Sequence, residues 1–325
     1  MNQIQLNELE LKIKKDYGNI AGIVVMKEGH VCYETYFNGF HSNDPFHVFS
    51  VTKSIVSILF GIAMDQGYIK SIDQKVLEFF PEYSIKRGEK TIQKITIRDM
   101  LTMSVPYKFK YAPYTKYFTS EDWVKSALDL LGGKRTKIGE FKYAPLVGPD
   151  ILTGILTKAT KQSVLTFANQ NLFLPLGINE KSAIVFQDKE EQLAFVRKNG
   201  MSGWVADPKG VNTAGWGLTL TAMEMAKIGQ LYLDQGVVNE QRVVSKEWIK
   251  ESTKEHIRWK ELDLPFGYLW WVQEDGYAAM GDGGNIIYVN RKQKIVVSIV
   301  STFKARVLDR LDFIKQELEP LFLEE

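Results

Sequence analysis

Residues 49–54 of this 325-residue chain read FSVTKS, and an apolar run follows them. Isoleucine and leucine recur in that run at helical spacing, so we predict a helix over residues 51–66 that ends at Gly67. Ser50 then lies at the start of the helix, and Lys53 lies one turn further on. Side chains three residues apart share a helix face, so the amine can reach the hydroxyl. The positive end of the helix dipole also favours an alkoxide at Ser50.

A nucleophilic hydroxyl needs a base, and lysine is a base only when it is neutral. Burial of Lys53 by the apolar helix would lower its pKa and supply that form. Two simpler interpretations stay open at this point. Ser50 could serve only as a helix N-cap, and the same Ser-x-x-Lys spacing recurs at Ser301 and Lys304.

Strands are predicted near both ends of the chain, and helices are predicted between them. The expected strands cover residues 20–26, 31–37, 268–273, 285–289 and 295–301. The expected helices cover residues 6–17, 96–103, 120–131, 150–160, 164–174, 221–234, 245–255 and 305–322, in addition to the helix after Ser50. This order favours an α+β fold in which one antiparallel sheet, built from both termini, is flanked by helices.

We predict a single domain, 1–325, with a helical lobe inserted into it. The α/β lobe takes up about 1–70 and 235–325, and the helical lobe takes up about 71–234. The active site is expected in the cleft between the two lobes.

Composition excludes several classes of protein. Hydrophobic residues make up 45% of the chain and the formal net charge is +2, which argues against disorder and against nucleic-acid binding. Cys32 is the only cysteine and the four histidines are scattered, so we expect no disulfide, no metal site and no cofactor. The polar N-terminus and the short apolar run at residues 55–64 predict a cytoplasmic protein without a signal peptide or a membrane span.

Several motifs together resemble the serine β-lactamase and penicillin-binding-protein superfamily over essentially the whole chain. The resemblance is closest to the class C-like branch, with its family VIII-type esterases and its amide hydrolases of the nylon-oligomer type. The matching segments are FSVTKS (49–54), ITIRDMLTMS (95–104), FKYAP (141–145), ILTGIL (151–156), NLFLPLGI (171–178), residues 215–234 and GYLWWV (267–272).

The resemblance implies a β-lactamase/transpeptidase-like fold and three catalytic roles. Ser50 resembles the acylated nucleophile, Lys53 its proton acceptor, and Tyr143 the second general base that relays a proton to the leaving group. Tyr111 is an alternative to Tyr143, because Tyr-Ala-Pro occurs at both places. Tyr143 is favoured because only it precedes the matching helix, and Tyr111 is expected to bind substrate from a loop over the pocket.

Two departures from the family pattern bear on the substrate. Pro145 stands where the tyrosine motif often has asparagine, so a side-chain amide for a substrate carbonyl is missing. Residues 277–285 stand where the family often carries Lys-Thr-Gly, and they contain no lysine to grip a substrate carboxylate.

That same segment can still supply a main-chain donor. We expect the amides of Ser50 and Asp282 to form an oxyanion hole, with Gly283 close by in the substrate site. Adjacent strand residues face opposite ways, so Trp271 is expected in the cleft wall and Trp270 in the core.

The sequence therefore predicts a cofactor-free serine hydrolase that acts through an acyl-enzyme on a small ester, amide or peptide-like substrate. A β-lactamase or a D-amino-acid peptidase is the first alternative, which the lack of a leader disfavours. A catalytically weak penicillin-binding or sensor module, which keeps the acylation machinery, is an alternative of another class.

Overall fold

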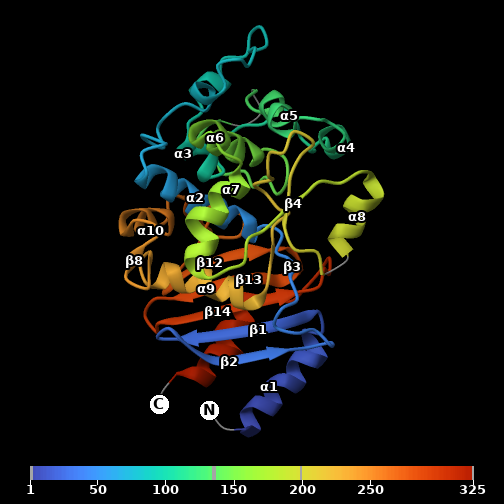
Figure 1. Ribbon diagram of the computed structural model, residues 1–325, viewed down its shortest axis with the longest axis vertical. Helices are drawn as coiled ribbons and strands as arrows, with labels where there is room; N and C mark the ends of the chain where they lie inside the picture. The colour runs from blue at the N-terminus through green and yellow to red at the C-terminus, as the bar shows by residue number, and fades with distance from the viewer. Residues whose placement is uncertain (1–2, 134–136, 198–199, 324–325) are drawn as a thin grey trace.

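The computed structural model describes residues 3–133, 137–197 and 200–323. Its central feature is an eight-stranded sheet in the order β2-β1-β14-β13-β12-β11-β10-β9, in which all neighbouring strands are antiparallel (Figure 1). The strands are β1 (Ile20–Lys27), β2 (His30–Tyr36), β9 (Ile257–Trp259), β10 (Leu264–Phe266), β11 (Trp271–Gln273), β12 (Gly276–Gly281), β13 (Asn285–Asn290) and β14 (Ile295–Ser301).

The two ends of the chain meet in this sheet. β1 pairs with β14, so that Val25 lies opposite Val297. Both strands are almost continuously apolar because helices cover both faces of the sheet. The predicted α+β fold, with one antiparallel sheet made from both termini, is confirmed.

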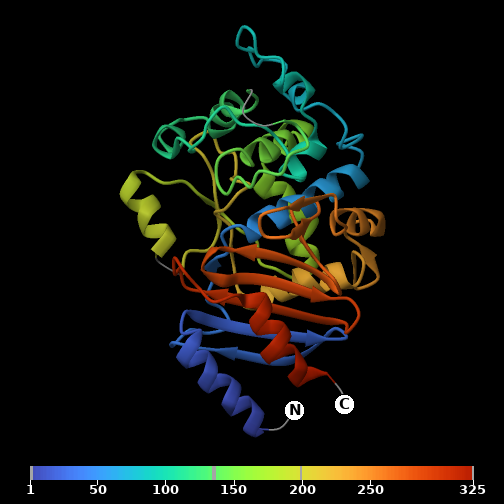
Figure 2. The same cartoon turned by 180° about the vertical axis from the view of Figure 1, so that it is seen from behind.

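One face of the sheet is covered by the terminal helices, which lie side by side in the rear view (Figure 2). These are α1 (Gln3–Asp16) and a C-terminal helix that runs through α11 (Arg310–Phe313), η6 (Ile314–Leu318) and η7 (Glu319–Phe322). The opposite face carries α9 (Ala222–Leu233), where the Ser298 hydroxyl donates to the Ala222 carbonyl at 2.7 Å.

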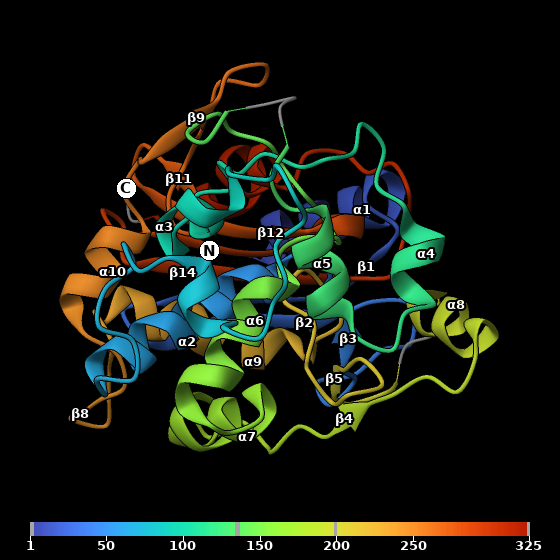
Figure 3. The same ribbon diagram turned by 90° about the horizontal axis from the view of Figure 1, so that it is seen from above.

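Helix α2 (Val51–Asp65) lies between the sheet and the remaining helices, and thirteen of its residues, 51–63, are buried. Helices α3, α5 and α6 lie above it and above the sheet (Figure 3). The helices on this side are α3 (Ile97–Leu101), α4 (Tyr114–Phe118), α5 (Trp123–Leu130), α6 (Asp150–Thr160), α7 (Val164–Ala168), α8 (Lys189–Arg197) and α10 (Lys246–Ser252).

Short elements complete the description. The single turns are η1 (Val76–Phe79), η2 (Ile92–Lys94), η3 (Asn169–Phe173), η4 (Leu174–Leu176) and η5 (Asp282–Gly284). The two-stranded pairs are β3 (Phe46–His47) with β6 (Thr219–Leu220), β4 (Ala183–Ile184) with β5 (Trp204–Val205), and β7 (Val237–Val238) with β8 (Gln241–Arg242).

Three predicted elements start three or more residues later than expected, and one of them is helix α5, which begins at Trp123 rather than at residue 120. The strand over 268–273 begins at Trp271, because Leu269 has a left-handed φ of 63° and the Gly267 amide closes a turn onto the Trp270 carbonyl. The final helix begins at Arg310, after Asp309 accepts a capping hydrogen bond. No helix in the described part of the chain is both long and apolar enough to span a bilayer.

Candidate active site

A strained turn presents Ser50 at the start of α2. Phe49 adopts a left-handed φ of 48°, which is costly for a bulky residue, and the Val51 amide then donates to the Val48 carbonyl. Ser50 lies at the N-cap position, but its side chain makes no capping hydrogen bond. Its hydroxyl is therefore available for another partner, and only 7% of the residue is exposed.

That partner is Lys53, one turn along the same helix. The Lys53 Nζ atom lies 2.7 Å from Ser50 Oγ, 2.7 Å from the Pro145 carbonyl oxygen and 2.7 Å from the Gly215 carbonyl oxygen. Ser50 Oγ is also 3.5 Å from the Gly215 oxygen. The amine thus has three hydrogen-bond partners, which are one hydroxyl and two main-chain carbonyls.

The surroundings of Lys53 favour its neutral form. Burial lowers its pKa to about 7, and the negative charges of Asp282 and Asp150 only partly oppose that change. A neutral amine has two N–H donors and one lone pair. The two carbonyls can take both donors, which leaves the lone pair directed at the hydroxyl of Ser50.

Tyr143 lies next to Ser50 and Lys53. Its ring centroid is 5.3 Å from Lys53 Nζ. Burial raises the pKa of Tyr143 to about 12, although hydrogen bonding with Ser50 lowers it in part. Tyr143 is therefore a protonated phenol at neutral pH, which suits it to donate a proton rather than to act as a free phenolate base. Tyr111, by contrast, is 80% exposed in the loop before α4.

Aromatic rings form a wall next to Tyr143. Its ring stacks on Trp259 at 5.9 Å and contacts Trp271 at 5.9 Å, and Phe141 touches both tryptophans. Trp270 points the other way and is fully buried. Trp270 stacks on Tyr232 instead, and it belongs to the turn before β11.

The end of β12 approaches Ser50 through its main chain. A Cβ atom on Gly281 would lie 2.2 Å from the Val48 carbonyl oxygen and 3.2 Å from the Ser50 nitrogen, so only glycine allows this contact. Asp282 and Gly283 follow in η5, where Gly283 has a φ of 76°. Within the described ranges, neither the Ser50 amide nor the Asp282 amide donates a hydrogen bond to another protein group.

The second Ser-x-x-Lys pattern lies in a different setting. Ser301 ends β14, where its hydroxyl is 3.5 Å from the Gly284 carbonyl oxygen, and Lys304 is exposed in the following loop. The two residues therefore do not share a helix face, and their amine and hydroxyl are not brought together as those of Ser50 and Lys53 are.

Several groups that shape the site carry no sequence signal of their own. The Pro145 and Gly215 carbonyls act through the main chain, so residue type did not reveal them. Asp150 accepts a hydrogen bond from the amide of Ala214, the residue before Gly215. His47 Nε2 accepts from the Gly217 amide at 2.9 Å, and burial lowers the pKa of His47 to about 3, so the ring is neutral.

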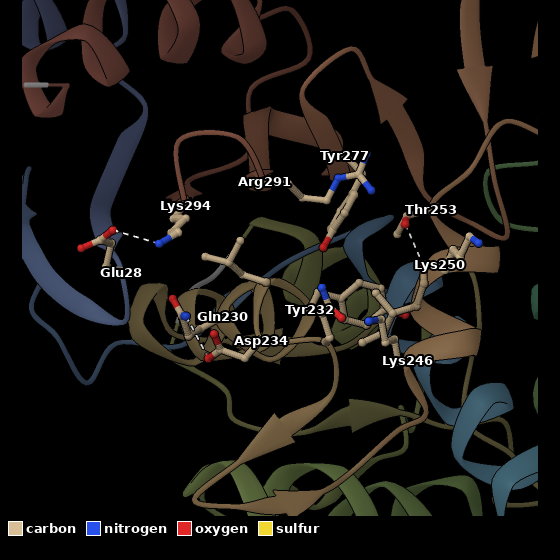
Figure 4. Close-up of a pocket in the computed structure, with 13 residues that line it drawn as sticks. Glu28, Gln230, Tyr232, Asp234, Lys246, Lys250, Thr253, Tyr277, Arg291 and Lys294 are labelled. Atoms are coloured by element: carbon tan, nitrogen blue, oxygen red, sulfur yellow. Dashed lines mark hydrogen bonds and ion pairs between the residues drawn. The ribbon is translucent and has the colours of Figure 1, made fainter.

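A separate polar hollow lies between α9, α10 and the strand ends (Figure 4). Its lining residues include Glu28, Gln230, Asp234, Lys246, Lys250, Arg291 and Lys294. Neither Ser50 nor Lys53 lines it, and its lysines belong to the exposed surface. Among the described residues, no group of three His, Cys, Asp or Glu side chains is arranged to hold a metal ion.

Comparisons with known proteins agree with this architecture. An uncharacterized protein of Alkalihalophilus pseudofirmus is 25% identical over 287 residues, which cover 83% of this chain and 77% of that protein. The 6-aminohexanoate-dimer hydrolase of Paenarthrobacter ureafaciens is 23% identical over 259 residues, which cover 76% of this chain but only 59% of the hydrolase. The crystal structure of a family VIII carboxylesterase superposes with a TM-score of 0.73 at 13% identity, covering 98% of this chain and 96% of that one.

A family model also matches most of the chain. The beta-lactamase family model matches residues 14–317, which include the α2 serine and lysine, the tyrosine and both ends of the sheet. The chain therefore belongs to the beta-lactamase family.

Proposed function

We propose that this protein is a serine hydrolase that cleaves a small carboxylic ester or amide through an acyl-enzyme on Ser50. The observation that carries the proposal is the 2.7 Å contact between Lys53 Nζ and Ser50 Oγ, with two carbonyls at 2.7 Å to orient the amine. Hydrolases of esters and amides occur among the relatives, which agrees with this assignment.

In the acylation step, neutral Lys53 takes the proton of the Ser50 hydroxyl while Oγ attacks the substrate carbonyl carbon. The carbonyl π bond opens and its oxygen becomes an oxyanion. The amides of Ser50 and Asp282 are the proposed donors to that oxyanion. Lys53 is now an ammonium held by the two carbonyls.

Collapse of the intermediate breaks the bond to the leaving group. Tyr143 donates its phenolic proton to the departing oxygen or nitrogen, and the ammonium of Lys53 returns a proton to the phenolate. Because the pKa of Tyr143 is raised, its phenol carries the proton that this relay needs at neutral pH. In deacylation, water attacks the acyl carbon, the same two groups pass its proton to Ser50 Oγ, and the acid is released. No cofactor enters either step.

The residues around Ser50 favour esters or simple amides over β-lactams as substrates. Pro145 offers no side-chain amide, and residues 277–285 offer no lysine for a carboxylate. Each such contact contributes about 1.5–3 kcal/mol when charged or well placed. Loss of both would weaken transition-state binding by roughly 3–6 kcal/mol, or about two to four decades in rate. The wall of Tyr143, Trp259 and Trp271 favours an apolar group next to the reacting carbonyl.

Fluorophosphonate labelling followed by mass mapping tests the nucleophile. We expect one adduct on Ser50 that disappears in Ser50→Ala, together with loss of p-nitrophenyl butyrate hydrolysis. Ser301→Ala is the matched control and should label like wild type. An adduct that persists in Ser50→Ala, or that maps to Ser301, would refute the assignment.

A comparison of substrates separates the alternatives. We expect kcat/KM for p-nitrophenyl butyrate to exceed that for nitrocefin by at least about two decades, as the missing contacts imply. A nitrocefin value equal to the ester value would favour a β-lactamase. A stable adduct without repeated release of product would favour the sensor-type module.

A further inference from the structure

We propose that Asp150 is a positioning residue for this reaction: its buried carboxylate holds the segment 214–215 so that the Gly215 carbonyl keeps Lys53 directed at Ser50. The inference rests on the proposed function, because it assigns a role in the acylation step. The residue lies outside the family motifs that identified the nucleophile and the tyrosine.

Asp150 is the first residue of α6 and only 1% of it is exposed. Its Oδ1 accepts the Ala214 amide at 2.7 Å, and its Oδ2 accepts the Tyr117 hydroxyl. The neighbouring Gly215 amide faces the same carboxylate and helps to lower its pKa. Two donors therefore meet one buried anion, one at each oxygen, whereas an asparagine would offer only one acceptor oxygen.

The chain of contacts from Asp150 to the reacting atoms is short. The carboxylate accepts from the Ala214 amide, and Gly215, the next residue, carries the carbonyl that lies 2.7 Å from Lys53 Nζ. A Cβ on Gly215 would lie 2.7 Å from the Pro145 carbonyl oxygen, so the main chain at Gly215 packs closely against the other carbonyl that receives the amine. A shift of this segment would move one acceptor and crowd the other.

Charged and titratable groups around Asp150 determine when it is ionised. Tyr117 on α4 and Tyr107 on the preceding loop face it with protonated phenols, and Lys53 faces it from α2. Burial raises the pKa of Asp150 to about 6, the hydrogen bonds oppose that rise, and the charge of Asp207 adds to it. The carboxylate is thus available as an acceptor above about pH 6 and is lost below it.

Asp207 provides a matched control. It is also a buried aspartate that accepts main-chain amides, from Trp123 at 3.0 Å and Val211 at 2.9 Å. Those amides do not belong to the segment that holds Lys53. Asp207→Asn therefore disturbs a comparable buried carboxylate, but it leaves the two carbonyls that contact Lys53 in place.

The experiment compares full-length wild type, Asp150→Asn and Asp207→Asn with p-nitrophenyl butyrate and a fluorophosphonate. We expect Asp150→Asn to lower kcat by about 10- to 100-fold, part of the 10²–10⁴ that a positioned base contributes. KM should stay within about twofold, and labelling of Ser50 should slow by the same factor as kcat. Asp207→Asn should keep wild-type kcat despite a lower urea midpoint.

The pH dependence of kcat/KM provides a second test, because a residue with a purely structural role would leave its shape unchanged. On the acid side, log(kcat/KM) of wild type should fall with a slope of about one below pH 7, as Lys53 is protonated, and of about two below pH 6, once Asp150 is protonated as well. Asp150→Asn should keep a slope of about one. Should Asp150→Asn fail to fold, Tyr117→Phe removes one donor that fixes the carboxylate. That variant should lower kcat several-fold at unchanged KM.

Equal kcat and equal labelling rates in wild type and Asp150→Asn would overturn the positioning role, and so would an unchanged kcat in Tyr117→Phe. Wild-type protein that is not labelled on Ser50 would instead overturn the proposed function itself. The two failures are therefore distinguishable.

Discussion

Replacement of Lys53 by methionine should change how the stability of the fold depends on pH. In the folded protein, burial lowers the pKa of Lys53 to about 7, whereas an unfolded lysine titrates near 10.4. Between these values the unfolded chain binds one more proton than the folded chain. The unfolding free energy of wild type therefore rises with pH by about 1.4 kcal/mol per pH unit from this residue. Lys53→Met lacks that contribution.

Urea unfolding at about pH 7.5 and about pH 9.5 measures the effect. Over these two pH units, wild type should gain about 2–3 kcal/mol of unfolding free energy relative to Lys53→Met. The difference between the two pH values cancels the constant cost of leaving the Pro145 and Gly215 carbonyls without a donor. Lys181→Met is the control, because Lys181 is a buried lysine whose Nζ pairs with Glu224 at 2.7 Å. Loss of this ion pair should destabilise the fold about equally at both pH values.

Parallel stability curves for wild type and Lys53→Met would refute the reasoning. They would mean that Lys53 stays protonated in the folded state up to the pKa of a free lysine. An ammonium has no lone pair to accept the Ser50 proton, so the proposed base at neutral pH would be lost with it.

Further substitutions probe the same site. Lys53→Arg keeps the charge but cannot deprotonate, so kcat for p-nitrophenyl butyrate should fall by roughly two to four decades; near-normal turnover would show that Lys53 serves only packing or charge. Tyr143→Phe should slow substrates with poor leaving groups, such as alkyl esters, far more than p-nitrophenyl esters, because p-nitrophenolate departs without a proton; equal losses for both, measured as kcat/KM ratios, would argue against the relay. Gly281→Ala should abolish activity and lower the urea midpoint, because its Cβ would lie 2.2 Å from the Val48 carbonyl oxygen; a fully active, equally stable variant would contradict that close approach.

Local features of the sequence were sufficient to predict the contact between Ser50 and Lys53. The helix after Ser50 was predicted over residues 51–66, and α2 spans Val51–Asp65. Because a helix fixes the geometry of residues three apart, the spacing of Ser50 and Lys53 alone implied their contact. Tyr143 could be chosen over Tyr111 because the helix that follows it, residues 150–160, matches the family pattern and the structure.

The sheet was also largely predictable, because strand periodicity and turn residues are local signals. The prediction was wrong where the backbone conformation departs from what the side-chain pattern indicates. Apolar residues 268–270 looked like the start of a strand, but the left-handed Leu269 places them in a turn. The short strands β9 and β10 were not predicted from their mixed polar and apolar residues.

Only the tertiary structure identified the groups that hold the lysine. The Pro145 and Gly215 carbonyls lie 92 and 162 residues from Lys53 in the chain, and every residue type carries such a carbonyl. Residue identity therefore gives no sign of them, and neither does it connect Asp150 to a segment 64 residues away. The sequence by itself determined which serine and lysine lie side by side, since one helix turn sets their distance. The fold decided how that amine is buried, oriented and kept neutral, since those properties arise from main-chain contacts between distant segments.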